Sequence, residues 1–187
     1  MLATKALEIL AVYADGGVIQ KNPSTLGGTW AWCHINTDLR VVDDVRQAIV
    51  ESGSGILYPH TRGLEEFVSN NHSEYFALIR GLRELPEGWS GKVYSDSAIT
   101  LGRFFSGWAN KNVPDAWEPH LRKTLARLGK LEPQLLDGHP TRSQLAAGLG
   151  KRGNPCSSFN VWCDHRCGDE AKQFIAAHSP REARAAA

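Results

Sequence analysis

The chain has 187 residues, of which 42% are hydrophobic and 22% are charged, and its formal net charge is +1. These proportions are typical of a folded globular domain with a sizeable core. The nearly neutral charge excludes a global basic field, so any binding of nucleic acid has to depend on a local basic patch.

No apolar run approaches the roughly 20 residues that span a bilayer, and residues 1–10 lack the layout of a signal peptide. We therefore expect a cytoplasmic monomer that does not contact membranes. Its four cysteines, Cys33, Cys156, Cys163 and Cys167, are expected to be reduced thiols.

The first element in chain order is an apolar run, Ile9–Ala14, followed by Asp15-Gly16-Gly17. Such a run predicts a strand with apolar neighbours on both faces. We expect the strand to end at Asp15, where the two glycines let a ligand approach the main chain closely. A second strand is predicted for Thr29–Ile35, which is rich in Trp and β-branched residues.

A third strand is predicted within Ile49–Tyr58, with a bulge or break at Ser52–Gly55. Beyond it, apolar residues recur at helical spacing across His72–Leu85, after the capping residues Ser69-Asn70-Asn71. Glu74 lies in the first turn of this helix. An acid at that position often does no more than complement the helix dipole.

Lys92–Ser97 predicts a short strand that ends in Asp96, and Ser97 then caps a helix that runs to about Trp108. Ligands of open parallel sheets bind at the carboxyl ends of the strands. Asp15 and Asp96 are two acids at such ends, with Glu74 between them in the sequence, so a shared site is favoured over two unrelated caps.

The remaining chain predicts an amphipathic helix, a short strand that leads to Asp137-Gly138-His139, a polar segment with some helix, and a final helix after Asp164. These elements occupy Ala116–Leu128, Pro133–Leu136, Thr141–Pro155 and a last range of uncertain start. We expect one domain over residues 1–180 and a frayed tail over 181–187.

Together these residues resemble type 1 ribonuclease H. The resemblance is carried by an Asp-Gly turn with a downstream Asn-Pro, an Asn-Asn before a helical Glu, an Asp-Ser after a strand, and a Gly-His loop followed by Asn-x-x-Cys-Asp. In this sequence the motifs are Asp15-Gly16 with Asn22-Pro23, Asn70-Asn71 with Glu74, Asp96-Ser97, and Gly138-His139 with Asn160 to Asp164. Their order and spacing match over most of residues 7–174.

The resemblance implies a five-stranded mixed sheet, three antiparallel strands followed by two parallel ones, with helices on both faces. It implies hydrolysis of the RNA strand of RNA–DNA hybrids, leaving 5′-phosphate and 3′-hydroxyl ends. Two Mg²⁺ ions, replaceable by Mn²⁺, would be held by Asp15, Glu74, Asp96 and Asp164. Carboxylates suit this hard cation, and a metal pair serves phosphodiester hydrolysis.

Residues 140–159 form an insertion relative to the family, so Asp169 remains an alternative to Asp164 as the fourth carboxylate. His139 is expected to relay protons or to ease product departure. We expect binding of the hybrid to be weaker than in other members of the family, or to depend on Lys151-Arg152 in the insertion.

Substrate binding is expected at Gly16, Gly17, Asn22, Asn71 and Ser97, where main-chain and polar groups can contact 2′-hydroxyls and phosphates. Two alternatives stay open: a DNA nuclease of the same fold, such as a resolvase or exonuclease, and an inactive hybrid-binding module. A zinc site of Cys156, Cys163, His165 and Cys167 is disfavoured because no Cys-x-x-Cys pair exists.

Overall fold

The computed structural model describes residues 8–109 and 113–178. The N-terminal residues 1–7 and the predicted tail 181–187 lie outside the described residues. In chain order the elements are β1 (Ala11–Val18), β2 (Gly28–Ile35), the 3₁₀ turn η1 (Val45–Gln47), β3 (Ile49–Leu57), α1 (Asn70–Glu84), β4 (Gly91–Ser95), α2 (Ala98–Phe105), the 3₁₀ turn η2 (Asp115–Trp117), α3 (Glu118–Ala126), β5 (Leu131–Leu135), α4 (Arg142–Ala147) and α5 (Ser158–His178).

The five strands form one mixed sheet in the order β3-β2-β1-β4-β5. β2 is antiparallel to both of its neighbours, β1 and β3, whereas β4 runs parallel to β1 and β5 runs parallel to β4. The predicted topology is therefore confirmed, and β1 is the central strand.

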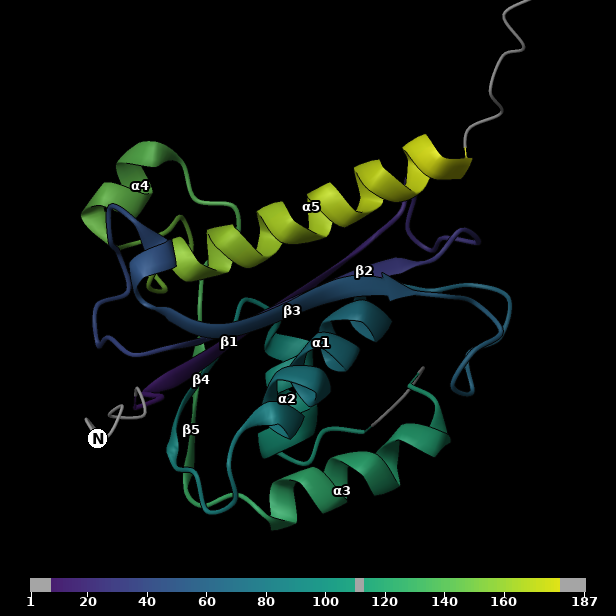
Figure 1. Cartoon of the computed structure of the whole chain (residues 1–187), viewed down its shortest axis with the longest axis horizontal. Helices are drawn as coiled ribbons and strands as arrows, with labels where there is room; N and C mark the ends of the chain where they lie inside the picture. Colours follow the sequence, from purple (N-terminus) through teal and green to yellow (C-terminus); the bar gives the residue numbers. More distant parts are fainter. Residues whose placement is uncertain (1–7, 110–112, 179–187) are drawn as a thin grey trace, which may run out of the picture.

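Helices cover both faces of the sheet, with α5 on one side and α1, α2 and α3 on the other (Figure 1). β1 is buried on both faces because helices cover both sides of the sheet and its side chains point alternately to the two sides. Ala11 and Tyr13 pack with Phe159 of α5, while Val12 and Ala14 belong to the core that contains α1. This arrangement agrees with the apolar run in the sequence.

The prediction that the first strand ends at Asp15 was wrong. β1 continues to Val18 and pairs with β2 along its full length, but it pairs with β4 only through Ala11–Tyr13. The antiparallel partner holds the glycines in the strand, so Asp15 lies beyond the last β1–β4 pair and not at a turn.

A bulge or break at Ser52–Gly55 was also wrong, because these residues pair in regular register with β2. The irregularity falls instead at His34/Ile35 of β2. The glycines instead leave room for the neighbouring tryptophan side chains. Cβ atoms at Gly53 and Gly55 would lie 2.8 and 2.9 Å from the rings of Trp32 and Trp30.

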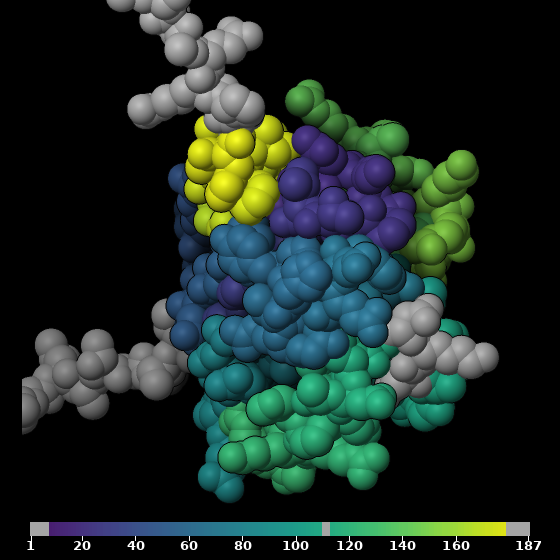
Figure 2. Space-filling view, turned by 90° about the vertical axis from the view of Figure 1, so that its right-hand side faces the viewer, coloured from purple at the N-terminus to yellow at the C-terminus, as the bar shows by residue number. Residues whose placement is uncertain are grey.

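The loop between β1 and β2 packs against the segment before α1. Ser24 and Val68 form a two-way backbone bridge, with N–H to O distances of 2.8 Å in both directions. Figure 2 shows this end of the molecule, where the purple hairpin lies beside the blue 58–69 segment, with α3 below and the end of α5 above. Within the described ranges, no helix is long and apolar enough to cross a membrane.

Candidate active site

Asp15 is the most buried of the predicted acids, with 7% of its surface exposed. It projects from the central strand, and its Oδ1 accepts a hydrogen bond of 2.7 Å from the Gly16 amide. The main chain of α1 lies directly against the next residue, because a Cβ on Gly16 would come within 2.3 Å of the Glu74 nitrogen. The glycine after Asp15 thus permits a backbone contact that brings Glu74 to β1.

Glu74 was predicted in the first turn of its helix but lies beyond the first turn of α1, because the helix already begins at Asn70. Its carboxylate interacts with Ser97 and Thr100 at the start of α2. Burial raises its pKa to about 7, hydrogen bonds from Ser97 and Thr100 act in the opposite direction, and the nearby charge of Asp96 adds to the rise. Its Oε2 atom is buried and has no hydrogen-bond partner among the described residues. A buried carboxylate oxygen without a donor is a natural ligand for a cation.

Asp96 follows β4 and precedes the N-cap of α2, as the sequence predicted. Burial raises the pKa of Asp96. A hydrogen bond from Asn160 and the positive potential of His139 oppose that rise, and Asp164 reinforces it. The Asn160 amide donates to Asp96 Oδ2 at 3.3 Å, so the first turn of α5 orients this carboxylate.

Asp164 lies one turn further along α5, beside the loop histidine. The Oδ2 atom of Asp164 is 3.5 Å from Nδ1 of His139, whose side chain is 76% exposed. Asp169 lies elsewhere: it forms an ion pair with Lys172 at 3.6 Å and borders a separate hollow with Trp162. The structure therefore brings Asp164, and not Asp169, to the other acids.

The four acids are close enough to act on one another's charge. Burial raises the pKa of Asp15 well above its usual range, and the negative charges of Asp96, Asp164 and Glu74 raise it further. Repulsion of this kind is relieved when a cation binds between the carboxylates. The cluster is an anionic centre built from β1, α1, the β4–α2 junction and α5.

The donor set fits a hard divalent cation, since it consists of carboxylate oxygens. However, no three His, Cys, Asp or Glu side chains in the described residues form a complete cage for a metal ion. Binding of Mg²⁺ would require the carboxylates to draw together around the ion.

The alternative zinc ligands do not come together. Cys163 and Cys167 are buried against β1, where their sulfur atoms lie 3.9 Å from the carbonyl of Tyr13 and 3.5 Å from that of Asp15. His165 is instead exposed on the outer side of α5.

The predicted substrate-binding residues occupy two places. Asn22 and Asn71 lie near each other, since the Asn22 side-chain oxygen accepts a bond of 3.2 Å from the Asn70 amide. The adjacent hollow is lined by Pro23, Phe67 and Asn71, among others. Ser97 is buried and caps α2 through Thr100, while Gly16 and Gly17 lie within β1.

Sequence analysis missed the role of Asp137, which is the second residue after the end of β5 and is only 3% exposed. It accepts hydrogen bonds from the main-chain N–H of Arg152 at 2.5 Å, from Arg152 Nε at 2.9 Å and from Asn154 at 2.9 Å. Burial alone would raise the pKa of Asp137, but these donors lower it. Asp137 therefore fixes the far end of the insertion to the sheet.

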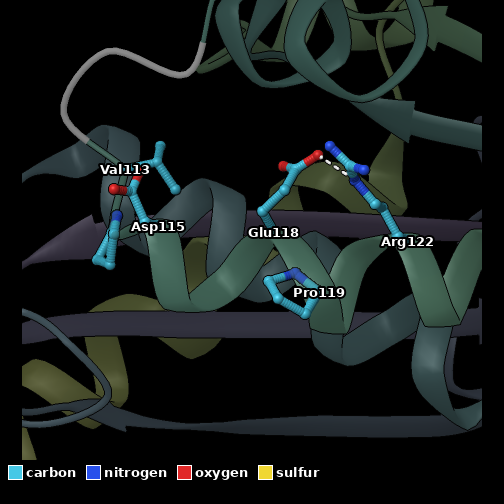
Figure 3. A pocket seen from close by; sticks show the side chains of 6 residues that line it. Val113, Asp115, Glu118, Pro119 and Arg122 are labelled. Carbon is cyan, nitrogen blue, oxygen red and sulfur yellow. Dashed lines mark hydrogen bonds and ion pairs between the residues drawn. The ribbon is translucent and has the colours of Figure 1, made fainter.

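Another hollow, of about 530 Å³, lies beside η2 and α3 on the opposite side of α1 from α5. Figure 3 shows its side chains, with Glu118 Oε1 accepting from Arg122 Nε at 3.0 Å. It contains none of the predicted site residues, so the acidic cluster is the stronger candidate for the active site.

No protein-family model matches the sequence. Among curated proteins, a ribonuclease H from Caldicellulosiruptor saccharolyticus is 28% identical over 157 residues, which cover 83% of this chain and 90% of that protein. A ribonuclease H from a Thermoanaerobacter species is 27% identical over 122 residues, covering 63% of this chain and 77% of that protein.

Solved structures share the fold at lower sequence identity. The N-terminal RNase H domain of a Mycobacterium tuberculosis protein, solved as a fusion with maltose-binding protein, has a TM-score of 0.58 and 16% identity, and the match covers 90% of this chain and 98% of that one. An RNase H1 solved in complex with an RNA/DNA hybrid has a TM-score of 0.54 and 15% identity, covering 88% and 98%.

Proposed function

This chain belongs to the ribonuclease H-like family, and from that premise we propose that it is a ribonuclease H that hydrolyses the RNA strand of RNA–DNA hybrids. The observation that carries the proposal is the convergence of Asp15, Glu74, Asp96 and Asp164, whose charges act on one another. Four acids from distant parts of the chain are costly to hold together unless a cation uses them.

Two Mg²⁺ ions, or Mn²⁺ in their place, would be held by Asp15 on the central strand together with Glu74, Asp96 and Asp164. When bound, such a metal pair activates water and stabilises the leaving 3′-oxygen, which yields 5′-phosphate and 3′-hydroxyl ends. The unpartnered Oε2 of Glu74 supports a cation at this position.

The protein's own residues supply orientation and proton handling. Asn160 holds Asp96 through one oxygen, which leaves the other oxygen available to a ligand. The imidazole of His139, next to Asp164 and exposed to solvent, can carry a proton between the site and bulk water.

Recognition of the hybrid would use the end of the molecule formed by the β1–β2 loop and the start of α1. Asn22 and Asn71 are polar and accessible there, and both amides can donate to 2′-hydroxyls or phosphates across a wide minor groove. One solved structure that shares the fold, an RNase H1, contains an RNA/DNA hybrid, which supports the same substrate for this chain.

The test compares cleavage of labelled RNA–DNA hybrid, double-stranded DNA and double-stranded RNA, with and without Mg²⁺. We expect only the hybrid to be cut, and only with Mg²⁺. Cleavage of DNA would assign a nuclease of the same fold to another substrate, and hybrid binding without turnover would identify an inactive binding module.

Three variants identify the carboxylates. Asp15→Asn should abolish cleavage while its far-UV circular dichroism spectrum stays unchanged, and retained activity would remove Asp15 from the site. Asp164→Asn should abolish cleavage, whereas Asp169→Asn, five residues further along the same helix, should keep it. The reverse result would make Asp169 the fourth ligand.

A further inference from the structure

The second wall of the acidic cluster is formed by residues 138–155, which we term the α4 segment. A hollow of about 510 Å³ has Glu74 and Asp96 on one side and residues of the α4 segment on the other, including His139, Gln144 and Lys151. A strand lying over the acids would therefore also touch this segment.

The α4 segment has a defined structure. Thr141 and Gln144 form a reciprocal capping box at the start of α4, and Gly148 ends the helix in the left-handed conformation at φ 68°. Leu149 and Pro155 then form a backbone bridge. With the Asp137 anchor at its base, the segment holds residue 151 at the edge of the hollow.

The two basic residues of the insertion have different surroundings. Arg152 is bound to Asp137 through Nε, and its guanidinium also donates to the carbonyl of Leu136 at 3.2 Å. Lys151 is exposed, and no carboxylate of the described residues forms an ion pair with it within 4 Å. Sequence analysis predicted that both residues contact the substrate. In the structure Arg152 instead holds the segment in place, and only Lys151 is available to bind a ligand.

Charge explains why a lysine is useful at this place. The four carboxylates repel an approaching polyanion wherever their charge is not neutralised by metal ions. A cation on the opposite side of the hollow offsets that repulsion. Contacts to phosphate fix the register of a nucleic acid on its protein without reading its sequence.

We propose that Lys151 binds a backbone phosphate next to the one that is cleaved, and so positions the substrate strand over the acids. This inference rests on the proposed function, because it requires a nucleic-acid strand in the hollow.

The experiment measures binding of labelled RNA–DNA hybrid by fluorescence anisotropy without Mg²⁺, from low to moderate salt. The proteins are wild type, Lys151→Gln, Lys151→Arg and, as matched control, Lys130→Gln. Lys130 is also exposed but is paired with Glu132 at 2.9 Å and precedes β5 at its opposite end.

Lys151→Gln should weaken binding about 5- to 10-fold at low salt and reduce the slope of log affinity against log salt by about one. Lys151→Arg and Lys130→Gln should keep the wild-type slope. If Lys151→Gln weakened binding only because residue 151 is needed for folding, Lys151→Arg would have no reason to keep the wild-type salt slope.

Cleavage by wild type with Mg²⁺ is measured in parallel. If wild type cleaves and Lys151→Gln keeps the wild-type slope, the role of Lys151 is overturned and the proposed function stands. If wild type binds the hybrid but does not cleave it, the proposed function falls and the salt slopes still decide on Lys151. A wild-type protein that neither binds nor cleaves overturns both.

Discussion

Replacing Glu74 with glutamine should stabilise the metal-free protein at alkaline pH and abolish its activity. Burial raises the pKa of Glu74 from 4.5 to about 7, so the folded protein holds a proton that the unfolded chain has lost. The stability associated with this proton is present below pH 4.5 and is lost as the pH rises through 7.

The size of the effect follows from the two pKa values. A rise from 4.5 to about 7 corresponds to about 3 kcal/mol of unfolding free energy lost by the wild type between pH 4.5 and pH 8. Glutamine has no charge to bury, and it keeps an oxygen that accepts from Ser97 and Thr100. The variant should therefore lose about 3 kcal/mol less than wild type over the same range.

The assay is urea unfolding at pH 4.5 and pH 8 in the presence of a chelator, together with hybrid cleavage in Mg²⁺. Glu84→Gln is the control, because it makes the same chemical change on an exposed side chain of the same helix, where a surface pair with Arg80 at 3.8 Å is worth about 0.5 kcal/mol or less. Equal pH dependence of stability in wild type and Glu74→Gln would refute the reasoning.

Three further changes test other parts of the site. Gly16→Ala should lower the unfolding free energy by about 3 kcal/mol, since its Cβ would lie 2.3 Å from the main chain of α1; a urea midpoint equal to that of wild type would contradict this close contact. Asp137→Ala should release the α4 segment, so limited digestion with trypsin should cut after Arg152 faster than in wild type, and equal rates would show that the anchor does not hold the segment. His139→Ala should lower kcat without abolishing cleavage, as measured by initial rates; unchanged kcat would leave His139 as an ordinary loop residue.

The places of three acids could be predicted because they depend on local patterns, whereas the five-stranded mixed sheet was predicted from the resemblance to type 1 ribonuclease H. A buried apolar strand before Asp15, an amphipathic helix around Glu74 and a strand–acid–cap sequence at Asp96 each fix a side chain relative to its own element. The order of these elements then places the side chains at one edge of a mixed sheet. Their catalytic role remains a prediction.

The course of β1 could not be predicted, because it depends on partners far away in the sequence. Glycines usually mark turns, but at Gly16 and Gly17 the antiparallel pairing with β2 continues the strand. The choice between Asp164 and Asp169 was open for a related reason. Both lie on α5, and only the packing of that helix on β1 determines which one faces Asp96.

No sequence pattern indicated that Asp137 anchors the α4 segment. Its partners, Arg152 and Asn154, follow 15 and 17 residues later, after a helix whose length the sequence did not define. Ion pairs across such a loop depend on how the loop returns to the sheet, and that path is set by packing.

The buried cysteines Cys163 and Cys167, which lie between α5 and β1 beneath the acidic cluster, give the protein an internal probe of how often α5 detaches. Burial raises the pKa of the thiols of Cys163 and Cys167, so they remain protonated and unreactive while α5 is docked on β1. A thiol reagent can label them only when α5 detaches, and this is the helix that carries Asp164. The rate at which Cys163 and Cys167 are labelled, measured by peptide mapping apart from the buried Cys33 and Cys156, therefore measures how often Asp164 leaves the cluster.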